Sequence, residues 1–239
     1  MSAVRVRRII TGRGGGRSTG PYAAFNLGGA VGDDPKAVAA NRSRLASAAG
    51  LTPDRVVWMR QVHGTTIRTV TDGAADTADT DGIVTTTTGL GLAVLVADCV
   101  PLLAADPAGA VIGAAHAGRK GAAAGIDREL LATMVRSGAA VGRIEVLVGP
   151  AICGACYEVP AEMRDEIEVL LPGSATTTRR GTPGLDLRAG LVRSLRAAGV
   201  AGVKVDPRCT LEDPALYSHR RGAPTGRQVG LIWLDASDS

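Results

Sequence analysis

The stretch GLAVLVADCVPLLAAD, residues 91–106, is strongly apolar, yet it places Asp98 and Cys99 side by side near its middle. Its apolar run predicts a buried β-strand over residues 91–97. A small cysteine packs well in a core, whereas a buried carboxylate without partners is costly. Cys99 can therefore be an inert packing residue, a nucleophile or a metal ligand, and the surrounding segments have to decide between these roles.

The segments on either side predict a mixture of strands and helices. Apolar or alternating runs indicate strands, and Asp or Pro starts followed by Gly stops indicate helices. The predicted strands are 4–10, 56–59, 65–70, 91–97, 110–116, 144–150 and 229–234, and the predicted helices are 33–50, 127–138, 160–173 and 186–199. A short turn containing DPAG would join strand 91–97 to strand 110–116. Asp127 and Asp186 are predicted to cap their helices, and Pro160 to open its helix.

The domain organisation follows from this mixture. No internal repeat and no long linker interrupts the chain, so residues 1–239 predict a single domain of the α/β or α+β class. The hydrophobic content of 45% and the charged content of 21% are those of a globular protein. An acidic loop is predicted over residues 72–82.

Composition also narrows the cellular setting and the partners. The N-terminus lacks an apolar leader, and the longest apolar run is too short to span a bilayer, so a cytoplasmic protein with reduced thiols is expected. The net charge of +4 allows an anionic ligand. The basic residues are spread along the chain and aromatic residues make up 3%, which argues against a nucleic-acid partner. The sequence does not indicate an oligomeric state.

The three histidines are the main chemical clue. His63 lies in QVHG between two predicted strands, His116 ends strand 110–116, and His219 lies near the C-terminus. Together, His63, Cys99 and His116 match a catalytic zinc site with three protein ligands and one open position, and a thiolate with two imidazoles suits zinc or copper. Such a metal could activate water or polarise a leaving group. A histidine after a strand is, however, often a plain loop residue, and whether Cys99 meets His116 depends on strand direction.

Two further motifs carry less information. Cys153 and Cys156 form a C-x-x-C pattern, but the YEVP that follows offers neither a clear helix start nor a second ligand pair, so a structural role is favoured. The glycine-rich GRGGG at 12–16 could cradle phosphate but lacks the Lys-Ser/Thr of a P-loop.

The motifs, taken in chain order, resemble one family: the multicopper polyphenol oxidase or laccase-domain proteins, also described as purine nucleoside phosphorylase-like and including peptidoglycan editing factors. The resemblance covers residues 11–234. It rests on RSTGPYAAFNLGGAVGDDPKAVAANR, QVHG, ADTDGIVT, GLAVLVADCVPLL, AAHAGRKG, VGPAICGACYEV, CT, YSHRR and TGRQVGLIWL.

The resemblance implies a fold and an activity. The fold would be a sandwich of mixed β-sheets flanked by helices. His63, Cys99 and His116 would bind one Zn²⁺ or Cu²⁺ and act in catalysis through it. The reaction would be phosphorolysis of adenosine, inosine or methylthioadenosine to the base and ribose 1-phosphate, with adenosine deamination beside it. The implied partners are a purine nucleoside and phosphate.

The chain departs from the family pattern in two places. Many relatives have HAGWRG where this chain has HAGRKG, so Arg119 replaces a tryptophan and Lys120 replaces an arginine. Lysine keeps the charge but loses the two-pronged hydrogen bonding of arginine. Many relatives also have CGCCYEV, where Ala155 stands here. Phosphate-binding candidates are the basic residues Arg13, Arg119, Lys120 and Arg220.

Asp98 is expected to accept hydrogen bonds from nearby backbone or to orient a metal ligand from behind.

Other functions use the same residues. A Cys–His hydrolase that edits peptidoglycan precursors would use Cys99 as nucleophile and His116 as base. A single-copper polyphenol oxidase is a further alternative, although three histidines are too few for a multicopper centre. The remaining alternative is a binding protein without catalytic activity.

Overall fold

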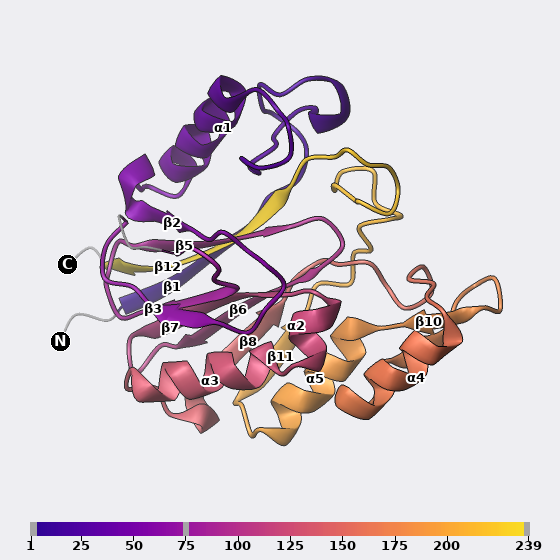
Figure 1. Ribbon diagram of the computed structural model, residues 1–239. Helices are drawn as coiled ribbons and strands as arrows, with labels where there is room; N and C mark the ends of the chain where they lie inside the picture. The colour runs from indigo at the N-terminus through magenta and orange to yellow at the C-terminus, as the bar shows by residue number, and fades with distance from the viewer. Residues whose placement is uncertain (1–3, 74–76, 237–239) are drawn as a thin grey trace.

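Two stacked β-sheets form the centre of the molecule (Figure 1). The computed structural model describes residues 4–73 and 77–236. The first sheet contains, in spatial order, β1 (Val4–Ile10), β12 (Gln228–Ala236), β5 (Gly91–Val96) and β2 (Val56–Trp58). The second contains β11 (Gly202–Val205), β8 (Glu145–Val148), β6 (Val100–Asp106), β7 (Val111–Ala117), β4 (Gly82–Thr85) and β3 (Ile67–Thr69). Strands β9 (Ala175–Thr177) and β10 (Pro183–Leu185) form a separate ribbon.

Helices flank both sheets and the β9–β10 ribbon. They are α1 (Pro35–Ala48), α2 (Arg119–Ala123), α3 (Ile126–Arg136), α4 (Ala161–Leu170) and α5 (Leu187–Ala197), with 3₁₀ turns at Gly20–Tyr22, Pro53–Arg55 and Val141–Arg143. Helix α1 packs on the first sheet, and α3 and α5 pack on the second (Figure 1). Each large sheet mixes parallel and antiparallel pairs. The predicted sandwich of mixed sheets flanked by helices is therefore confirmed.

Strand β6 shows why its sequence is apolar without alternation. Leu102 and Ala104 face the core beneath the helices, whereas Leu103 and Ala105 face the core between the two sheets. Both faces are buried, so neither favours polar residues. The strand thus provides a rigid base for the residues at its ends.

The predicted strands 91–97 and 110–116 are confirmed as β5 and β7, but the prediction that a short turn joins them directly is wrong, because β6 lies between them. Residues 91–106 form two strands in different sheets: β5 pairs with β12 and β2, and β6 pairs with β7. The chain changes sheets at Asp98, whose φ of 92° lies in the left-handed region and interrupts the extended path. Asp98 and Cys99 in the middle of this stretch therefore mark a crossover between sheets.

The helix boundaries follow the sequence signals with one exception. Asp34 caps α1 by accepting from the Lys36 N–H at 2.9 Å, Asp186 caps α5 by accepting from the Ala189 N–H at 3.0 Å, and Pro160 precedes α4. Asp127 does not cap α3. The cap is Gly125, with a φ of 88°, and the Asp127 carboxylate instead accepts a hydrogen bond from Ser194 on α5 at 2.5 Å.

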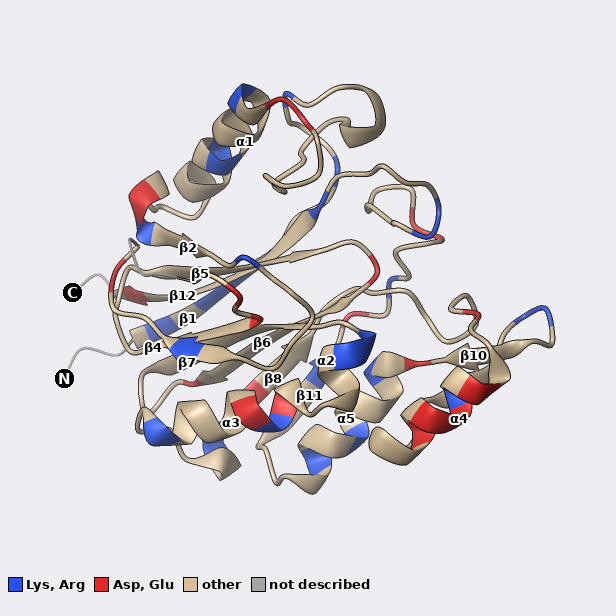
Figure 2. Ribbon diagram, viewed as in Figure 1, with Lys and Arg blue, Asp and Glu red and all other residues tan. Residues whose placement is uncertain are grey.

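The surface carries both signs of charge. Lys and Arg lie on α1, α2, α3 and α5, whereas Asp and Glu gather on α4 (Figure 2). Residues 74–76 of the predicted acidic loop lie outside the described residues. Among the residues that the structure describes, no helix is both long and apolar enough to cross a membrane.

Candidate active site

Antiparallel pairing of β6 with β7 brings Cys99 next to His116. Pro101 near the start of β6 pairs with His116 near the end of β7, and Cys99 lies just before β6. His63 reaches the same point from the connection between β2 and β3. The Cys99 Sγ lies 3.8 Å from His63 Nε2, and the two imidazole rings meet edge to face at 4.7 Å. The potential ligand atoms of the three residues all lie within 4.8 Å of one another.

The loop that carries His63 is held on both sides by side chains. Gln61 makes two hydrogen bonds with the backbone of Leu95 in β5, each 2.8 Å long. The Asp81 carboxylate accepts from three successive backbone N–H groups, those of Val62, His63 and Gly64, at 2.7–3.2 Å. These contacts hold His63 at a φ of 63°, a left-handed conformation that aims its side chain at Cys99.

Asp81 also fixes His116, and sequence reasoning missed it. Its Oδ1 lies 2.9 Å from His116 Nδ1, which leaves His116 Nε2 free to face a ligand. Asp81 is fully buried and directly precedes β4. The available signal was its place at the end of an acidic loop, immediately before the apolar run GIVT.

Gly118 lets β7 turn into α2 against the three candidate ligands. A Cβ atom at this position would lie 2.5 Å from His63 Cδ2, 3.3 Å from Cys99 Sγ and 3.4 Å from His116 Cε1. Gly121, one turn later, lies against the Gly64 carbonyl, where a Cβ would approach to 2.7 Å. The HAGRKG segment therefore needs both glycines to close over the site.

The electrostatics of the site favour a thiolate. Burial opposes ionisation of Cys99, but hydrogen bonds from His116 and His63 outweigh it and lower the pKa of the thiol to about 6. Burial likewise opposes the charged form of His116, yet Asp81 and Cys99 raise its pKa to about 9. Near neutral pH the pair is thus a thiolate beside an imidazolium in the absence of a metal.

A cavity of about 450 Å³ opens above these residues, a size suited to a small organic ligand. Met59, Leu95, Val96, Ile152, Tyr157 and Leu187 contribute its apolar lining. Its basic lining comes from Arg60, Arg119, Arg220 and Arg227, and His219 also faces it. The Arg220 guanidinium lies 5.2 Å from the centre of the Tyr157 ring, which places one cation above an aromatic wall.

Comparison with known proteins agrees with this architecture. The sequence profile of the multi-copper polyphenol oxidoreductase laccase family matches residues 7–235. The chain belongs to this family. Among its relatives, the purine nucleoside phosphorylase of Mycobacterium tuberculosis is 56% identical over 235 residues, covering 98% of this chain and 94% of the relative. The purine nucleoside phosphorylase of Corynebacterium glutamicum is 52% identical, with 96% and 94% covered.

Solved structures of similar proteins share the laccase-family fold. YlmD from Geobacillus stearothermophilus superposes with a TM-score of 0.87 at 36% identity, covering 96% of this chain and 92% of YlmD. The Bacillus licheniformis protein YfiH superposes with a TM-score of 0.88 at 32% identity, with 95% and 92% covered. The family resemblance inferred from the sequence motifs is therefore confirmed.

Within this laccase-family fold the phosphate-binding candidates separate into two groups. Arg119 and Arg220 line the cavity, but Arg13 and Lys120 are not among the described residues that do so. Arg13 donates to the Ala23 carbonyl at 3.2 Å and lies 5.0 Å from the centre of the Tyr217 ring. Lys120 is exposed on the first turn of α2.

Asp98 lines the cavity and makes its hydrogen bonds away from the candidate ligands. It accepts from the Thr210 hydroxyl at 2.6 Å and from the Arg220 backbone N–H at 2.7 Å. These contacts tie the crossover between β5 and β6 to the segment that carries His219 and Arg220.

Proposed function

We propose that this protein is a metal-dependent purine nucleoside phosphorylase that also deaminates adenosine. The observation that carries the proposal is the shared cavity: the His63, Cys99 and His116 donors lie beside four arginines and an apolar wall. The names of the relatives from Mycobacterium and Corynebacterium, at 56% and 52% identity, support the phosphorylase part of this proposal.

The three candidate ligands fit one zinc or copper ion. Two imidazoles and a thiol of lowered pKa supply donors that both metals accept, and three protein ligands leave one position for water or substrate. Asp81 behind His116 is the outer carboxylate that such histidines commonly have. When bound, the metal would supply a Lewis acid at the base of the cavity.

The side chains of the chain itself would place the two substrates. We assign phosphate to Arg119 and Arg220, whose guanidinium groups can each donate two hydrogen bonds to an anion. The apolar wall at Ile152 and Tyr157 would hold the flat purine away from water, so that the ribose C1′ faces the phosphate. Arg13 and Lys120, outside the cavity, would contribute only long-range attraction for the anion.

The proposal is tested with zinc-loaded protein, adenosine and phosphate. We expect adenine and ribose 1-phosphate from phosphorolysis and inosine from deamination, and the His63→Ala variant should lose both by about 100-fold or more. The Arg220→Gln variant should raise the KM for phosphate about ten-fold or more, whereas Lys120→Gln should change it little. Release of neither adenine nor inosine by the loaded wild type would refute the proposal.

One observation favours a second candidate, a metal-free Cys–His hydrolase. The Cys99 thiol has its pKa lowered to about 6 beside His116, which is the arrangement of a nucleophile with its base. The substrates would then be amide bonds in peptidoglycan precursors. Hydrolysis of such amides by chelator-treated protein, lost in Cys99→Ser, would favour this candidate over phosphorolysis.

A further inference from the structure

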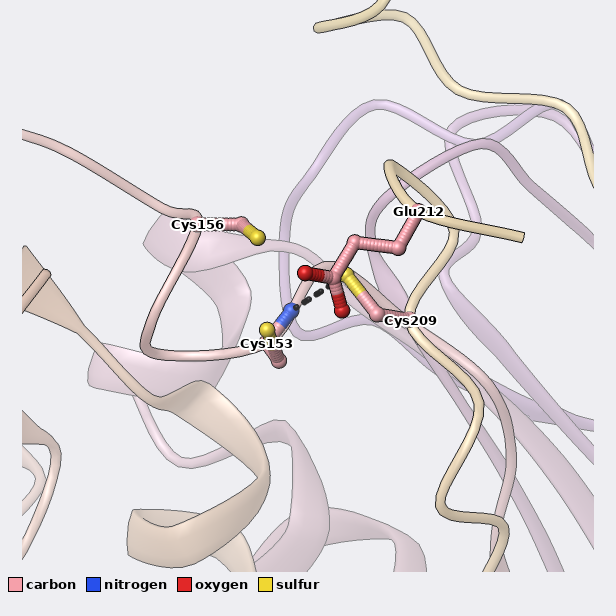
Figure 3. A group of neighbouring side chains, drawn as sticks. All are labelled: Cys153, Cys156, Cys209 and Glu212. Atoms are coloured by element: carbon pink, nitrogen blue, oxygen red, sulfur yellow. Dashed lines mark hydrogen bonds between the residues drawn. The ribbon is translucent and has the colours of Figure 1, made fainter. Parts of the chain in front are cut away.

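A second group of sulfur and carboxylate donors lies outside the proposed active site. Cys153 and Cys156 come from the C-x-x-C turn after β8, and Cys209 and Glu212 come from the loop after β11 (Figure 3). Their potential ligand atoms all lie within 4.8 Å of one another. Figure 3 shows the side chains of Cys153, Cys209 and Glu212 converging, with Cys156 pointing toward them from the far end of the turn.

The backbone holds this group in place. The Cys156 N–H donates to the Cys153 carbonyl at 2.9 Å, which closes the C-x-x-C turn. The Cys153 N–H donates to Cys209 Sγ at 3.4 Å, and a parallel β-bridge joins Ala151 to Cys209. Backbone N–H donors to sulfur stabilise a thiolate and are common around metal-bound cysteines.

The turn is also packed tightly from behind. Gly154 lies inside it, and a Cβ atom there would lie 2.7 Å from Asp186 Cβ and 2.9 Å from Thr176 Cγ2. The segments that present the donors are thus fixed by packing as well as by hydrogen bonds. Such fixed presentation is what a metal site of defined geometry requires.

We propose that Cys153, Cys156, Cys209 and Glu212 bind one Zn²⁺ ion as a structural site, separate from the site at Cys99. Three thiolates and a carboxylate complete a tetrahedral zinc shell with no open position, the mark of a structural site. A Zn–S bond of about 2.3 Å places tetrahedral ligand atoms about 3.8 Å apart. The observed limit of 4.8 Å fits that spacing after small side-chain rotations.

Alternative metal chemistry fits this group less well. An iron–sulfur cubane separates its cysteines by several metal and sulfide atoms and needs a wider opening than these donors leave. Magnesium and calcium prefer oxygen donors, which here come only from Glu212. Glu212 is ion-paired with Arg179, so one carboxylate oxygen can face the metal while the other keeps its guanidinium partner.

The position of the site suggests what the ion stabilises. Ile152 and Tyr157, on either side of the C-x-x-C turn, line the active-site cavity, and the Ile152 N–H donates to the Asp98 carbonyl at 3.1 Å. Thr210, next to Cys209, donates to the Asp98 carboxylate. A zinc ion would therefore join the segment that lines the cavity at Ile152 and Tyr157 to the segment whose Thr210 holds Asp98.

The test counts zinc in full-length protein that is purified, stripped with a chelator under reducing conditions and reloaded with Zn²⁺. We expect about two equivalents in the wild type, about one in Cys99→Ser, about one in Cys156→Ser and almost none in the double variant. Replacement by Co²⁺ should give sulfur-to-cobalt absorption roughly three-fold stronger for the cluster than for the single-thiolate site. A Glu212→Gln variant, with the exposed Glu166→Gln as control, tests the carboxylate without removing a buried thiol.

The outcomes are distinct. Zinc that is retained in Cys99→Ser and lost on further substitution of Cys156 supports the structural site, even if the Cys99 site binds no metal. Loss of all zinc in Cys99→Ser alone overturns the structural site and leaves the proposed activity intact. A zinc content that Cys156→Ser and Glu212→Gln both leave at the wild-type level also overturns it, as does the finding of a Cys153–Cys156 disulfide in freshly isolated protein.

Discussion

The two cysteine sites of this molecule contain the same functional group in opposite electrostatic surroundings. At Cys99 burial disfavours the thiolate, but two histidines overcome this and lower the pKa of the thiol to about 6. At Cys153 and Cys156 burial acts in the same direction, and the nearby Cys209 thiol adds to it, so the pKa values of both thiols are raised. The charge of the neighbours, rather than the depth of burial, decides which site holds a thiolate before any metal arrives.

The Cys99 site is therefore ready to bind a metal, whereas the thiols of the Cys153 group lose their protons only when a cation binds. The Cys99 site has its anion, its oriented imidazole and a cavity above it, as a catalytic site needs. The Cys153 group has only donors, so a metal would have to displace protons from them on binding. Substitutions at the two sites should therefore affect different properties, activity at the first and folding stability at the second.

The largest contrast is expected between Cys99→Ser and Cys156→Ser. Loss of the Cys99 thiolate should reduce kcat/KM for adenosine phosphorolysis on the order of 100-fold or more, with little change in melting temperature. Cys156→Ser should instead lower the melting temperature and reduce kcat/KM by less than about ten-fold. Steady-state kinetics and thermal unfolding of both variants measure these effects. Equal losses of activity in the two variants would contradict the assignment of a catalytic role to one site and a structural role to the other.

A second contrast concerns the two carboxylates near the site. Asp81→Asn should weaken zinc binding about 10- to 100-fold, because the His116 ring loses its anionic partner. Asp98→Asn should have a smaller effect on zinc, since Asp98 bonds Thr210 and the Arg220 backbone. Chelator competition gives both affinities, and circular dichroism checks that each variant is folded. If Asp98→Asn weakens zinc binding more than Asp81→Asn does, Asp98 rather than Asp81 is the carboxylate that supports the zinc ligands.

The candidate ligands could be identified from the sequence because each lies in a short motif that is recognised from its immediate neighbours. QVHG, ADC and HAG each place one donor beside small residues at a strand boundary. Their meeting could not be derived from spacing, since it depends on the antiparallel pairing of β6 with β7. The crossover at Asp98 was also hidden, because an apolar run looks the same whether it remains in one sheet or enters a second.

Two other features were beyond sequence reasoning for a related reason. Asp81 acts through backbone N–H groups and a histidine that lies 35 residues away, and no local pattern predicts such contacts. Cys209 approaches Cys153 across 56 residues, so the C-x-x-C motif lacked its further ligands when viewed alone. Strands and helices leave periodic signals in the sequence, whereas contacts between loops do not.

A third prediction compares the reactivity of the thiols in metal-free protein. Cys99 and Cys156 are both partly buried, so access is similar and ionisation should decide. The thiolate attacks the carbon of iodoacetamide and displaces iodide, so alkylation of Cys99 should rise through pH 6 and level off by about pH 7. Alkylation of Cys156 should still be rising above pH 9. At pH 7 the expected ratio of rates is well over ten-fold, because the weaker nucleophilicity of a thiolate of low pKa offsets only about half of the gain from ionisation on a logarithmic scale. Mass spectrometry of the modified peptides gives both rates, and faster labelling of Cys156 would contradict the assigned environments.

The smallest effects should come from adding one methyl group beside each site. In Gly118→Ala the new Cβ would lie 2.5 Å from His63 Cδ2, so the His63 side chain has to move from its observed position. Strain of about 1 kcal/mol in that side chain corresponds to about five-fold weaker zinc binding at the Cys99 site. Gly154→Ala should weaken only the Cys153 group, because its Cβ would meet Asp186 behind the turn. Gly142→Ala is the matched control, since no atom lies within 4 Å of its added Cβ. If Gly118→Ala and Gly142→Ala bind zinc equally well at the Cys99 site, His63 has more freedom than its hydrogen-bonded loop indicates. If Gly154→Ala then still weakens zinc binding, the Cys99 site is less rigid than the group at Cys153.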